Sequence, residues 1–553
     1  MTRRKNNTLT KLIKRRIECF FLMTILLFGC LSYRVIYLSI YKNKEYEKKI
    51  NNQSTETVSL NSGRGIIFDR NNVSLTDNDK EKVILVPKDV VSGNFKNIAL
   101  IKSATNLDEK DIYKAVQKQI SSEIIEIEID KIDETKIEEL EDNNILVEEK
   151  TKRYSDNNLL THLIGYIKTS ENLGVSGIEK YMNDELKDKN KNYVSVFKAG
   201  ANNSGLTYLK GSLGNISWSD DTINLKLTID SKLQQKIETI MDKEDNPSAV
   251  VVSDVESGEI LAMCSRPNFN QNDISSYVNS KNGELQNRVL SVTYPPGSVF
   301  KLVVLFAALN NNIIDENYVY NCTGSTSIGN NGEVLRCNNN KAHGIENLNE
   351  AFSNSCNCAF YDIAKRVGRD KIYEAIKILH LDDKVDIGID EEVNSKIPDD
   401  IALSNLAIGQ ANIEFTPLQI NQLTQIIASN GNYKTLSIYS ELVDRDFNSI
   451  KTYKSSKKSE IIAPYTMIRI KEMMNSVSKL GTASSLADIK NGCGVKTGTA
   501  QSSKNGEKVC HGWITGYYPE INPKYAITVI VEGTKEESKS ATPIFKEICE
   551  KLK

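Results

Sequence analysis

The sequence predicts an α+β fold in which an antiparallel sheet packs against a helical subdomain, preceded by an elongated mixed domain and one transmembrane helix. Three observations predict it: an apolar run near the amino terminus, strand-like segments at both ends of the carboxy-terminal region, and a largely helical stretch between them. A chain of 553 residues exceeds one ordinary domain. We expect four parts: a cytoplasmic tail (1–16), an anchor (17–40), a pedestal domain (41–222) and a carboxy-terminal domain (223–553).

The amino-terminal segment has the charge pattern of a membrane anchor. Residues 1–16 carry seven positive charges and no acid, and the apolar run 17–40 follows. That run is long enough to span a bilayer, which takes about 20 residues. The positive flank predicts a cytoplasmic amino terminus and extracytoplasmic domains. A cleaved signal peptide is the alternative, although the run is long and lacks a small-residue cleavage site. We expect a single-pass protein of the cell membrane.

The pedestal region, 41–222, is rich in Lys, Asp, Glu and Ile. Its pattern predicts short alternating strands and amphipathic helices with a solvated charged face. The whole chain has a net charge of -2, so it shows no basic footprint and no nucleic-acid partner is expected.

The carboxy-terminal domain begins with an alternating strand and a helix capped by Asp230 or Ser231. Residues 248–267 read as two strands joined by a turn at 256–258. Three further strands and a last helix lie near the carboxy terminus. One antiparallel sheet would then be built from both ends of the domain, with a cleft beside the helical middle at about 290–480.

A serine at the start of a buried helix carries the strongest chemical signal. Ser298 follows Pro-Pro-Gly and precedes Lys301 by three residues, which places both side chains on one helix face. Apolar surroundings should lower the pKa of Lys301, so that its neutral amine can take the serine proton. Only 4 histidines are present, which makes a histidine-based triad less expected. Two other Ser-x-x-Lys segments, at 455–458 and 476–479, lack this context.

Two motifs downstream complete a pattern. Ser355-Cys356-Asn357 and Lys496-Thr497-Gly498-Thr499 follow in order, the second on a predicted strand. The order S-x-x-K, S-x-N, K-T-G resembles the penicillin-binding transpeptidases. The segments "GRGIIFDRN", "RYSDNN" and "GVSGIEKY" resemble the class B subgroup, whose amino-terminal region is a non-catalytic pedestal of the dimerisation type. No glycosyltransferase-like segment is seen, which argues against a bifunctional class A enzyme.

The resemblance implies a serine-type peptidoglycan D,D-transpeptidase. Ser298 would attack the penultimate D-Ala carbonyl of a stem peptide, and Lys301 would be the base. Ser355 would relay a proton, and Asn357 would hold the substrate amide and Lys301. Backbone N–H groups of Ser298 and Thr499 would form an oxyanion hole. Lys496 would supply positive charge to the cleft, and Thr497 and Thr499 would bind the substrate carboxylate. Gly498 would let the strand lie close to the ligand.

The resemblance also implies partners: stem peptides on lipid II-derived glycan strands, β-lactams that acylate the serine, and a membrane glycosyltransferase. A carboxypeptidase or β-lactamase-type hydrolase is an alternative, and so is a β-lactam-binding sensor or scaffold. The anchor and pedestal argue against a freely diffusing β-lactamase. The roughly 16 residues before the anchor leave no cytoplasmic output domain for a sensor.

Four further residues predict a structural zinc site. Cys322, Cys337, His343 and Cys356 bracket polar Gly/Asn-rich loops that bury no core of their own. A Cys3His set is a closed tetrahedral zinc site. Some elongation-type class B members are similar here, with acids in place of the first two cysteines. This favours a zinc-containing, elongation- or sporulation-like branch, although the sequence does not separate elongation, division and spore formation.

Two alternatives to zinc stay open, a Cys322–Cys337 disulfide and free thiols. In an extended segment alternate side chains point to opposite sides. We therefore expect Ser355 and Asn357 to face the cleft and Cys356 to face the metal.

Overall fold

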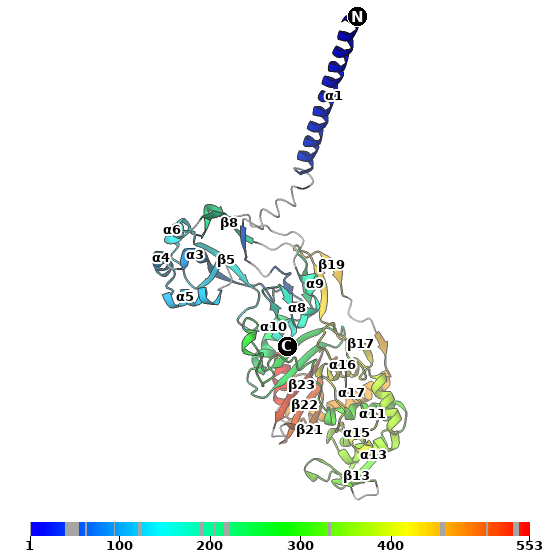
Figure 1. Ribbon diagram of the computed structural model, residues 1–553. Coiled ribbons are helices and arrows are strands. Elements are labelled where there is room, and N and C mark those ends of the chain that lie inside the picture. Colours follow the sequence, from blue (N-terminus) through cyan, green and yellow to red (C-terminus); the bar gives the residue numbers. More distant parts are fainter. Residues whose placement is uncertain are drawn as a thin grey trace. The chain divides into compact units, whose positions relative to one another are not determined.

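A computed structural model describes most of the chain, and the described residues form two compact units (Figure 1). The described residues are 2–38, 42, 55–60, 63–92, 94–119, 124–187, 193–202, 205–213, 222–329, 333–453, 459–504, 507–534 and 541–552. Unit 1 comprises Met1–Leu60, Glu81–Lys150 and Asn192–Ser217, and unit 2 comprises Asn61–Lys80, Thr151–Lys191 and Trp218–Lys553. Two segments of the predicted pedestal range thus pack in unit 2.

The amino-terminal helix α1 (Thr2–Ile36) contains a membrane-length apolar span. This span, Ile13–Ile36, has 24 residues and a mean hydropathy of 2.0. It overlaps the predicted anchor (17–40) over residues 17–36 and begins four residues earlier. Residues 39–40, the predicted end of the anchor, lie outside the described residues.

Among the described residues, the rest of unit 1 contains two small sheets and four short α-helices. Strands β1, β8 and β9 form an antiparallel sheet, and a second sheet has the order β4-β3-β5. Isoleucines of β3 and β4 pack with α4 and α5 into one core, as the alternating Ile pattern predicts. The bounds are β1 (Thr55–Ser59), β3 (Asp79–Pro87), α3 (Lys88–Val91), α4 (Phe95–Thr105), α5 (Glu109–Lys118), β4 (Ile124–Ile129), η2 (Glu134–Lys136), α6 (Ile137–Asp142), β5 (Leu146–Lys152), β8 (Tyr193–Asn202) and β9 (Gly205–Leu213).

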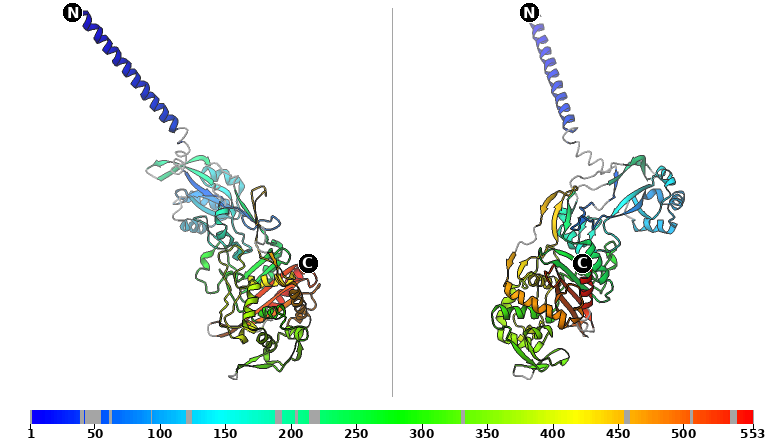
Figure 2. Two further views of the ribbon diagram at one scale, coloured as in Figure 1. Left: turned by 90° about the vertical axis from the view of Figure 1, so that its right-hand side faces the viewer. Right: turned by 180° about the vertical axis from the view of Figure 1, so that it is seen from behind.

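Unit 2 is built on a five-stranded antiparallel sheet of order β12-β11-β23-β22-β21 (Figures 1 and 2). Two strands come from the start of the domain and three from its end, which confirms the predicted assembly. The buried run of β11 explains its central place, because a strand covered on both faces is apolar throughout. The bounds are β11 (Ser248–Asp254), β12 (Ile260–Arg266), β21 (Gly494–Lys504), β22 (Glu507–Tyr518) and β23 (Tyr525–Thr534).

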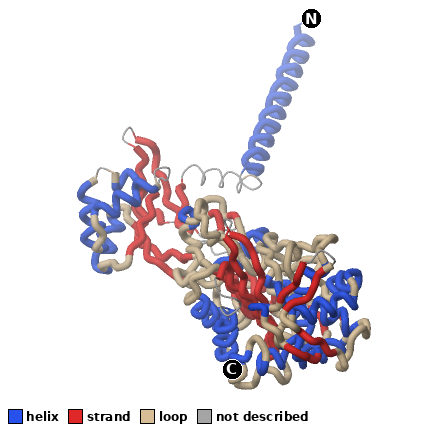
Figure 3. Tube along the Cα trace, turned by 90° about the horizontal axis from the view of Figure 1, so that it is seen from below, coloured by secondary structure: helices blue, strands red, loops and turns tan. Residues whose placement is uncertain are grey.

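Helices cover this sheet (Figure 3). α16 (Pro417–Ala428) is buried along its whole length and packs on β11, β22 and β23. A capping box between Thr416 and Gln419 begins it. α10 (Ser231–Met241) and α18 (Ala541–Lys551) pack together on the sheet. Asp230 caps α10 through the N–H groups of residues 232 and 233.

In the helical middle of unit 2, the helices α13, α14, α15 and α17 pack against α11. Several short strands also belong to this unit. The predicted first strand, β10, joins a separate sheet of order β19-β18-β10-β2. The remaining bounds are β2 (Ile67–Phe68), α7 (Thr161–Ile164), β6 (Ile167–Lys168), β7 (Leu173–Gly174), α8 (Gly177–Tyr181), α9 (Asn183–Leu186), β10 (Asn224–Leu227), η3 (Ile274–Ser276), η4 (Gly297–Phe300), α11 (Lys301–Asn310), β13 (Val319–Cys322), β14 (Ser325–Ile328), β15 (Glu333–Arg336), η5 (Asn338–Asn340), β16 (Gly344–Asn347), α12 (Leu348–Ser353), α13 (Asn357–Val367), α14 (Arg369–Ile378), α15 (Leu403–Ile408), β17 (Asn432–Lys434), β18 (Tyr439–Val443), β19 (Ser449–Thr452), β20 (Ser459–Ile461), α17 (Pro464–Leu480) and η6 (Ser484–Leu486).

A buried charge cluster explains the three pedestal-like motifs. Arg64, Arg153 and Glu179 come one from each motif and meet inside unit 2. The Glu179 carboxylate accepts from Arg64 Nε and from Arg153 Nε, both at 2.8 Å. Tyr154 also donates to it at 3.1 Å, and Arg153 pairs with Asp77. These contacts tie the segments 61–80 and 151–191 to each other.

Candidate active site

Ser298 lies on a short 3₁₀ turn that leads into a buried helix. η4 (Gly297–Phe300) precedes α11, so the predicted helix start is present but its first turn is 3₁₀. Gly297 has φ +54°, and a Cβ there would lie 2.4 Å from the Thr499 carbonyl oxygen. Glycine is therefore required for this turn to touch β21. Its N–H donates to Gly409 O at 2.9 Å.

Lys301 is fully buried and is bonded to the S-x-N segment. Its Nζ donates to Ser355 O at 2.6 Å, Ser355 Oγ at 3.1 Å and Asn357 Oδ1 at 2.7 Å. Burial lowers the pKa of Lys301 to about 8, and neighbouring thiols oppose this effect. The amine is thus near the point at which it can be neutral at physiological pH.

Lys496 approaches the same hydroxyl from β21. Its Nζ lies 3.0 Å from Ser355 Oγ and is fully buried. Burial lowers its pKa well below the usual value, and the nearby charge of Lys301 lowers it further. Ser355 Oγ is therefore a bridge between two lysines that repel each other when both are charged.

Ser355 reaches this position through a left-handed backbone, and the predicted extended segment is wrong. Ser355 has φ +54° and stands between α12 and α13. Cys356 is the N-cap of α13 and accepts from the Ala359 N–H at 3.4 Å. A turn between two helices thus separates the side chains: Ser355 and Asn357 reach Lys301, whereas Cys356 reaches Cys337.

The K-T-G segment forms one wall of the cleft as part of β21. A Cβ at Gly498 would lie 2.8 Å from Pro296 O and 2.9 Å from Val299 Cγ2. The strand therefore lies directly against the turn that carries Ser298. Thr497 Oγ1 and Thr482 Oγ1 are 2.6 Å apart, and Gln410 Nε2 donates to Thr499 O at 3.2 Å.

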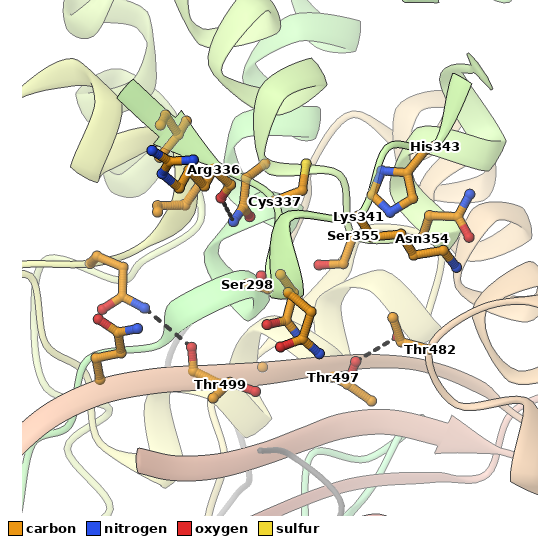
Figure 4. A pocket seen from close by; sticks show the side chains of 18 of the residues that line it. Ser298, Arg336, Cys337, Lys341, His343, Asn354, Ser355, Thr482, Thr497 and Thr499 are labelled. Carbon is orange, nitrogen blue, oxygen red and sulfur yellow. Dashed lines mark hydrogen bonds between the residues drawn. The ribbon is translucent and has the colours of Figure 1, made fainter. Parts of the chain in front are cut away.

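These residues line one cavity of about 890 Å³ (Figure 4). Of the residues predicted for catalysis or substrate binding, six line it directly: Ser298, Ser355, Asn357, Thr497, Gly498 and Thr499. Lys301 and Lys496 lie beneath it and reach it through Ser355. The cavity is also lined by Arg336, Lys341 and Thr482, which the sequence interpretation missed because nothing local marks them. Two of these are cations, and no described acidic residue lines the cavity.

The four predicted metal ligands form a compact cluster behind the S-x-N turn. The donor atoms of Cys322, Cys337, His343 and Cys356 all lie within 4.8 Å of one another. The Sγ atoms of Cys322 and Cys337 are 3.6 Å apart, and Cys322 Sγ is 3.4 Å from His343 Nδ1. The structure has no bond between the Cys322 and Cys337 sulfurs, whose separation is well beyond the disulfide bond length of about 2.05 Å.

The fold and the site together define a serine acyltransferase. The nucleophile Ser298 shares its cavity with Ser355, and two buried lysines hydrogen-bond to the Ser355 hydroxyl. Residues 248–550 match the family described as "Penicillin binding protein transpeptidase domain", and residues 59–210 match "Penicillin-binding Protein dimerisation domain". The chain belongs to the penicillin-binding protein transpeptidase family, in its class B form. The resemblance predicted from the three motifs is thereby confirmed.

Characterised relatives span almost the whole chain. "Stage V sporulation protein D" of Bacillus subtilis is 27% identical over 545 residues, covering 93% of this chain and 82% of the relative. "Peptidoglycan D,D-transpeptidase FtsI" of Buchnera aphidicola is 26% identical, covering 94% and 91%. A solved structure of the penicillin-binding protein PBP2 from Helicobacter pylori superposes with a TM-score of 0.67 at 24% identity, covering 90% of this chain and 98% of that one. The last likeness confirms the α+β transpeptidase fold.

Proposed function

We propose that this protein is a peptidoglycan D,D-transpeptidase that works through an ester on Ser298. The observation that carries this is the position of Ser355 Oγ, 3.1 Å from Lys301 Nζ and 3.0 Å from Lys496 Nζ, in the cavity that Ser298 lines. A hydroxyl between two amines can pass a proton in either direction. That is what acylation and deacylation need, because the serine proton leaves in one step and returns in the other.

In the first step Ser298 Oγ bonds to the carbonyl carbon of the penultimate D-Ala. The C–N bond to the terminal D-Ala breaks, and the departing nitrogen takes the proton that Ser298 lost. Neutral Lys301 is the first acceptor of that proton, and Ser355 and Lys496 deliver it to the leaving amine. In the second step an amino group of another stem peptide attacks the ester, a peptide bond forms, and Ser298 regains its proton. Backbone N–H groups of Ser298 and Thr499 stabilise the oxyanion, a contact worth about 3–4 kcal/mol per donor.

The charge of the cavity suits the substrate. Arg336 and Lys341 line it and no described acid does, and β-lactams and stem peptides both carry carboxylates. Thr497 and Thr499 offer hydroxyls to the carboxylate of the terminal D-Ala. Because burial holds the pKa of Lys496 well below its usual value, the positive charge for this carboxylate comes from Arg336 and Lys341.

Labelling with a fluorescent penicillin tests this function. The full chain in detergent should take up one label on Ser298, mapped by mass spectrometry, and Ser298→Ala should take up none. Ser476→Ala is the matched control, because Ser476 has the same Ser-x-x-K spacing on α17. Persistence of the ester without an acceptor, and its transfer to a D-amino acid amine, separate a transpeptidase from a hydrolase. A label on another serine, or none, would overturn the proposal.

We also propose a structural zinc ion held by Cys322, Cys337, His343 and Cys356. In a tetrahedron with Zn–S bonds of about 2.3 Å, neighbouring sulfurs are about 3.8 Å apart. The Sγ pairs in the cluster measure 3.6 and 3.7 Å. The buried Glu346 carboxylate lies beside the cluster, with its Oε2 3.7 Å from His343 Nδ1, so a cation here would compensate a buried carboxylate.

The zinc ion would supply a closed four-ligand clamp with no position for water. The zinc ion would hold two residues of the catalytic cleft in place, because Ser355 directly precedes the ligand Cys356 and Arg336 directly precedes the ligand Cys337. Elemental analysis of the purified full chain should give one zinc per protein. An intact Cys322–Cys337 disulfide without zinc would rule this out. A zinc site of this kind favours the elongation- or sporulation-like branch.

Membrane topology and partnership extend the proposal. The seven positive charges within residues 1–16 support a cytoplasmic amino terminus, an extracytoplasmic transpeptidase domain and a single-pass anchor. Thiol-reactive impermeant labelling of a cysteine placed at position 2 should fail in intact cells.

Because the two matched domains polymerise no glycan, we infer a membrane glycosyltransferase partner for the nascent strands. One related structure holds PBP2 with MreC. Crosslinking from the helix α1 should capture the glycosyltransferase, and its absence would contradict this inference.

A further inference from the structure

A second cavity of about 920 Å³ lies in unit 2 and shares no lining residue with the catalytic cleft. Its walls come from α8, the segment 380–394, the middle of α16, β17 and the chain after it, β18, and β19 with the residue that follows it. Figure 1 labels α8, α16, β17 and β19. Nothing in the catalytic chemistry above uses it. Its size is within the range of about 300–1,000 Å³ that is usual for ligand sites.

Aromatic rings form one side of this cavity. The rings of Tyr181 and Tyr439 stack with centroids 6.0 Å apart, and Tyr453 lies 5.4 Å from Tyr439. Gly388, at φ +80°, lets the backbone lie against them, since a Cβ there would be 2.9 Å from the Tyr439 ring. Tyr439 Oη donates to Gly388 O at 2.7 Å. The rings are thereby held in place, and Tyr181 remains 47% exposed.

Polar groups without recorded partners form the rim. The side chains of Asp383, Asp386 and Asn394 are exposed at the cavity and no hydrogen bond is recorded for them among the described residues. Ser437 Oγ is buried and has no recorded partner either. Lys384 and Lys451 balance the two acids, so the lining is formally neutral. The catalytic cleft, in contrast, is lined by cations and by no acid among the residues that the structure describes.

We propose that this cavity binds the glycan backbone of peptidoglycan, a neutral chain of N-acetylated amino sugars, which rests on the proposed transpeptidase function. The C–H faces of a sugar ring pack on tyrosine rings, whose amphipathic character suits a half-wet site. Sugar hydroxyls and N-acetyl groups bond to carboxylate, amide and hydroxyl groups. An acidic stem peptide fits the cationic cleft better than this neutral, aromatic surface. One protein could thus hold the strand at a site separate from the peptide it cross-links.

Binding of N-acetylglucosamine tetramer to the full chain in detergent, measured by calorimetry, tests the inference. Tyr181→Ala and Tyr453→Ala should each weaken binding at least tenfold, while Tyr181→Phe, which keeps the ring, should stay within about twofold. The matched control is Tyr465→Ala, because Tyr465 is 74% exposed on α17 outside the cavity. Penicillin labelling of Ser298 should be normal in all four variants, which also shows that they fold.

The glycan site would be overturned if the wild-type protein bound no saccharide, if Tyr181→Ala and Tyr453→Ala bound the tetramer as tightly as wild type, or if binding were lost once Ser298 carries a penicillin. Displacement of the tetramer by a free stem peptide would make this a peptide site instead and would also overturn it. If the wild-type protein takes up no penicillin, only the transpeptidase function is overturned, because saccharide binding is measured by calorimetry on protein that carries no penicillin.

Discussion

Asn357 Nδ2 donates a hydrogen bond of 2.9 Å to the carbonyl oxygen of Arg336, and so joins the S-x-N motif to the hairpin that carries Cys337. Asn357 also accepts from Lys301 through its Oδ1 at 2.7 Å. One amide therefore links the buried lysine to the residue beside a proposed metal ligand. The cysteine cluster and the acylation machinery are mechanically coupled through it.

Because of this coupling, Cys356→Ser should lower acylation and stability together. In the proposed zinc site, loss of one ligand would remove the clamp on Ser355 and Asn357, and metal binding contributes directly to the folding free energy. We expect loss of bound zinc, a lower melting temperature and a β-lactam acylation rate at least tenfold slower. Cys549→Ser is the matched control: this thiol is buried on α18, away from the cluster. It should cost some stability but leave zinc content and acylation unchanged, and equal behaviour of the two variants would contradict the coupling.

Acylation should become faster as pH rises through about 8. A buried amine favours its neutral form, so the pKa of Lys301 falls to about 8 and the proton acceptor appears above that pH. With this pKa the neutral fraction is about a tenth at pH 7 and about a half at pH 8. The rate constant with a chromogenic β-lactam should therefore increase about fivefold over that interval and less than twofold from pH 8 to 9. A flat profile between pH 6.5 and 9 would show that Lys301 is not the base.

Periodicity and motif order predicted much of this structure, and long-range packing decided the rest. The buried run of β11 and the S-x-x-K helix start are local patterns, and both elements formed where predicted. The left-handed Ser355 has no local signal, because the turn is imposed by two helices that pack elsewhere. Arg336 and Thr482 come from a hairpin and a helix end whose positions depend on the whole domain.

The same limit explains how the early segments pack. Composition and the class B resemblance assigned residues 41–222 to one pedestal, yet 61–80 and 151–191 pack in unit 2. The sequence motifs that mark this packing were recognisable only by resemblance. Their physical content, a carboxylate shared by two guanidiniums, appears once Arg64, Arg153 and Glu179 are brought together from distant positions.

Glu179→Gln should destabilise unit 2 strongly. The carboxylate and the Arg64 side chain are fully buried, and the substitution leaves Arg64 and Arg153 without their shared counter-charge. Breaking a buried pair by removing one partner costs about 3–5 kcal/mol. Urea unfolding followed by the fluorescence of Trp513, buried on β22, measures it. Glu171→Gln, which removes an exposed pair with Lys168, should change the free energy of unfolding by less than about 1 kcal/mol. Similar losses for both variants would mean that the buried cluster contributes no more than a surface pair.

Gly498→Ala should impair acylation far more than stability. The new methyl group would meet Pro296 O at 2.8 Å and Val299 Cγ2 at 2.9 Å, and neither a backbone oxygen nor a packed valine can move aside freely. Because β21 is an edge strand of the sheet, it can shift away from the Ser298 turn while its pairing with β22 persists. A displacement of about 1 Å in a catalytic site can cost about 10²-fold in rate. We therefore expect a near-normal melting temperature with β-lactam acylation slowed by one to two orders of magnitude. Unchanged acylation kinetics would mean that the strand does not need to touch the serine turn, and an unfolded protein would mean that β21 cannot shift independently.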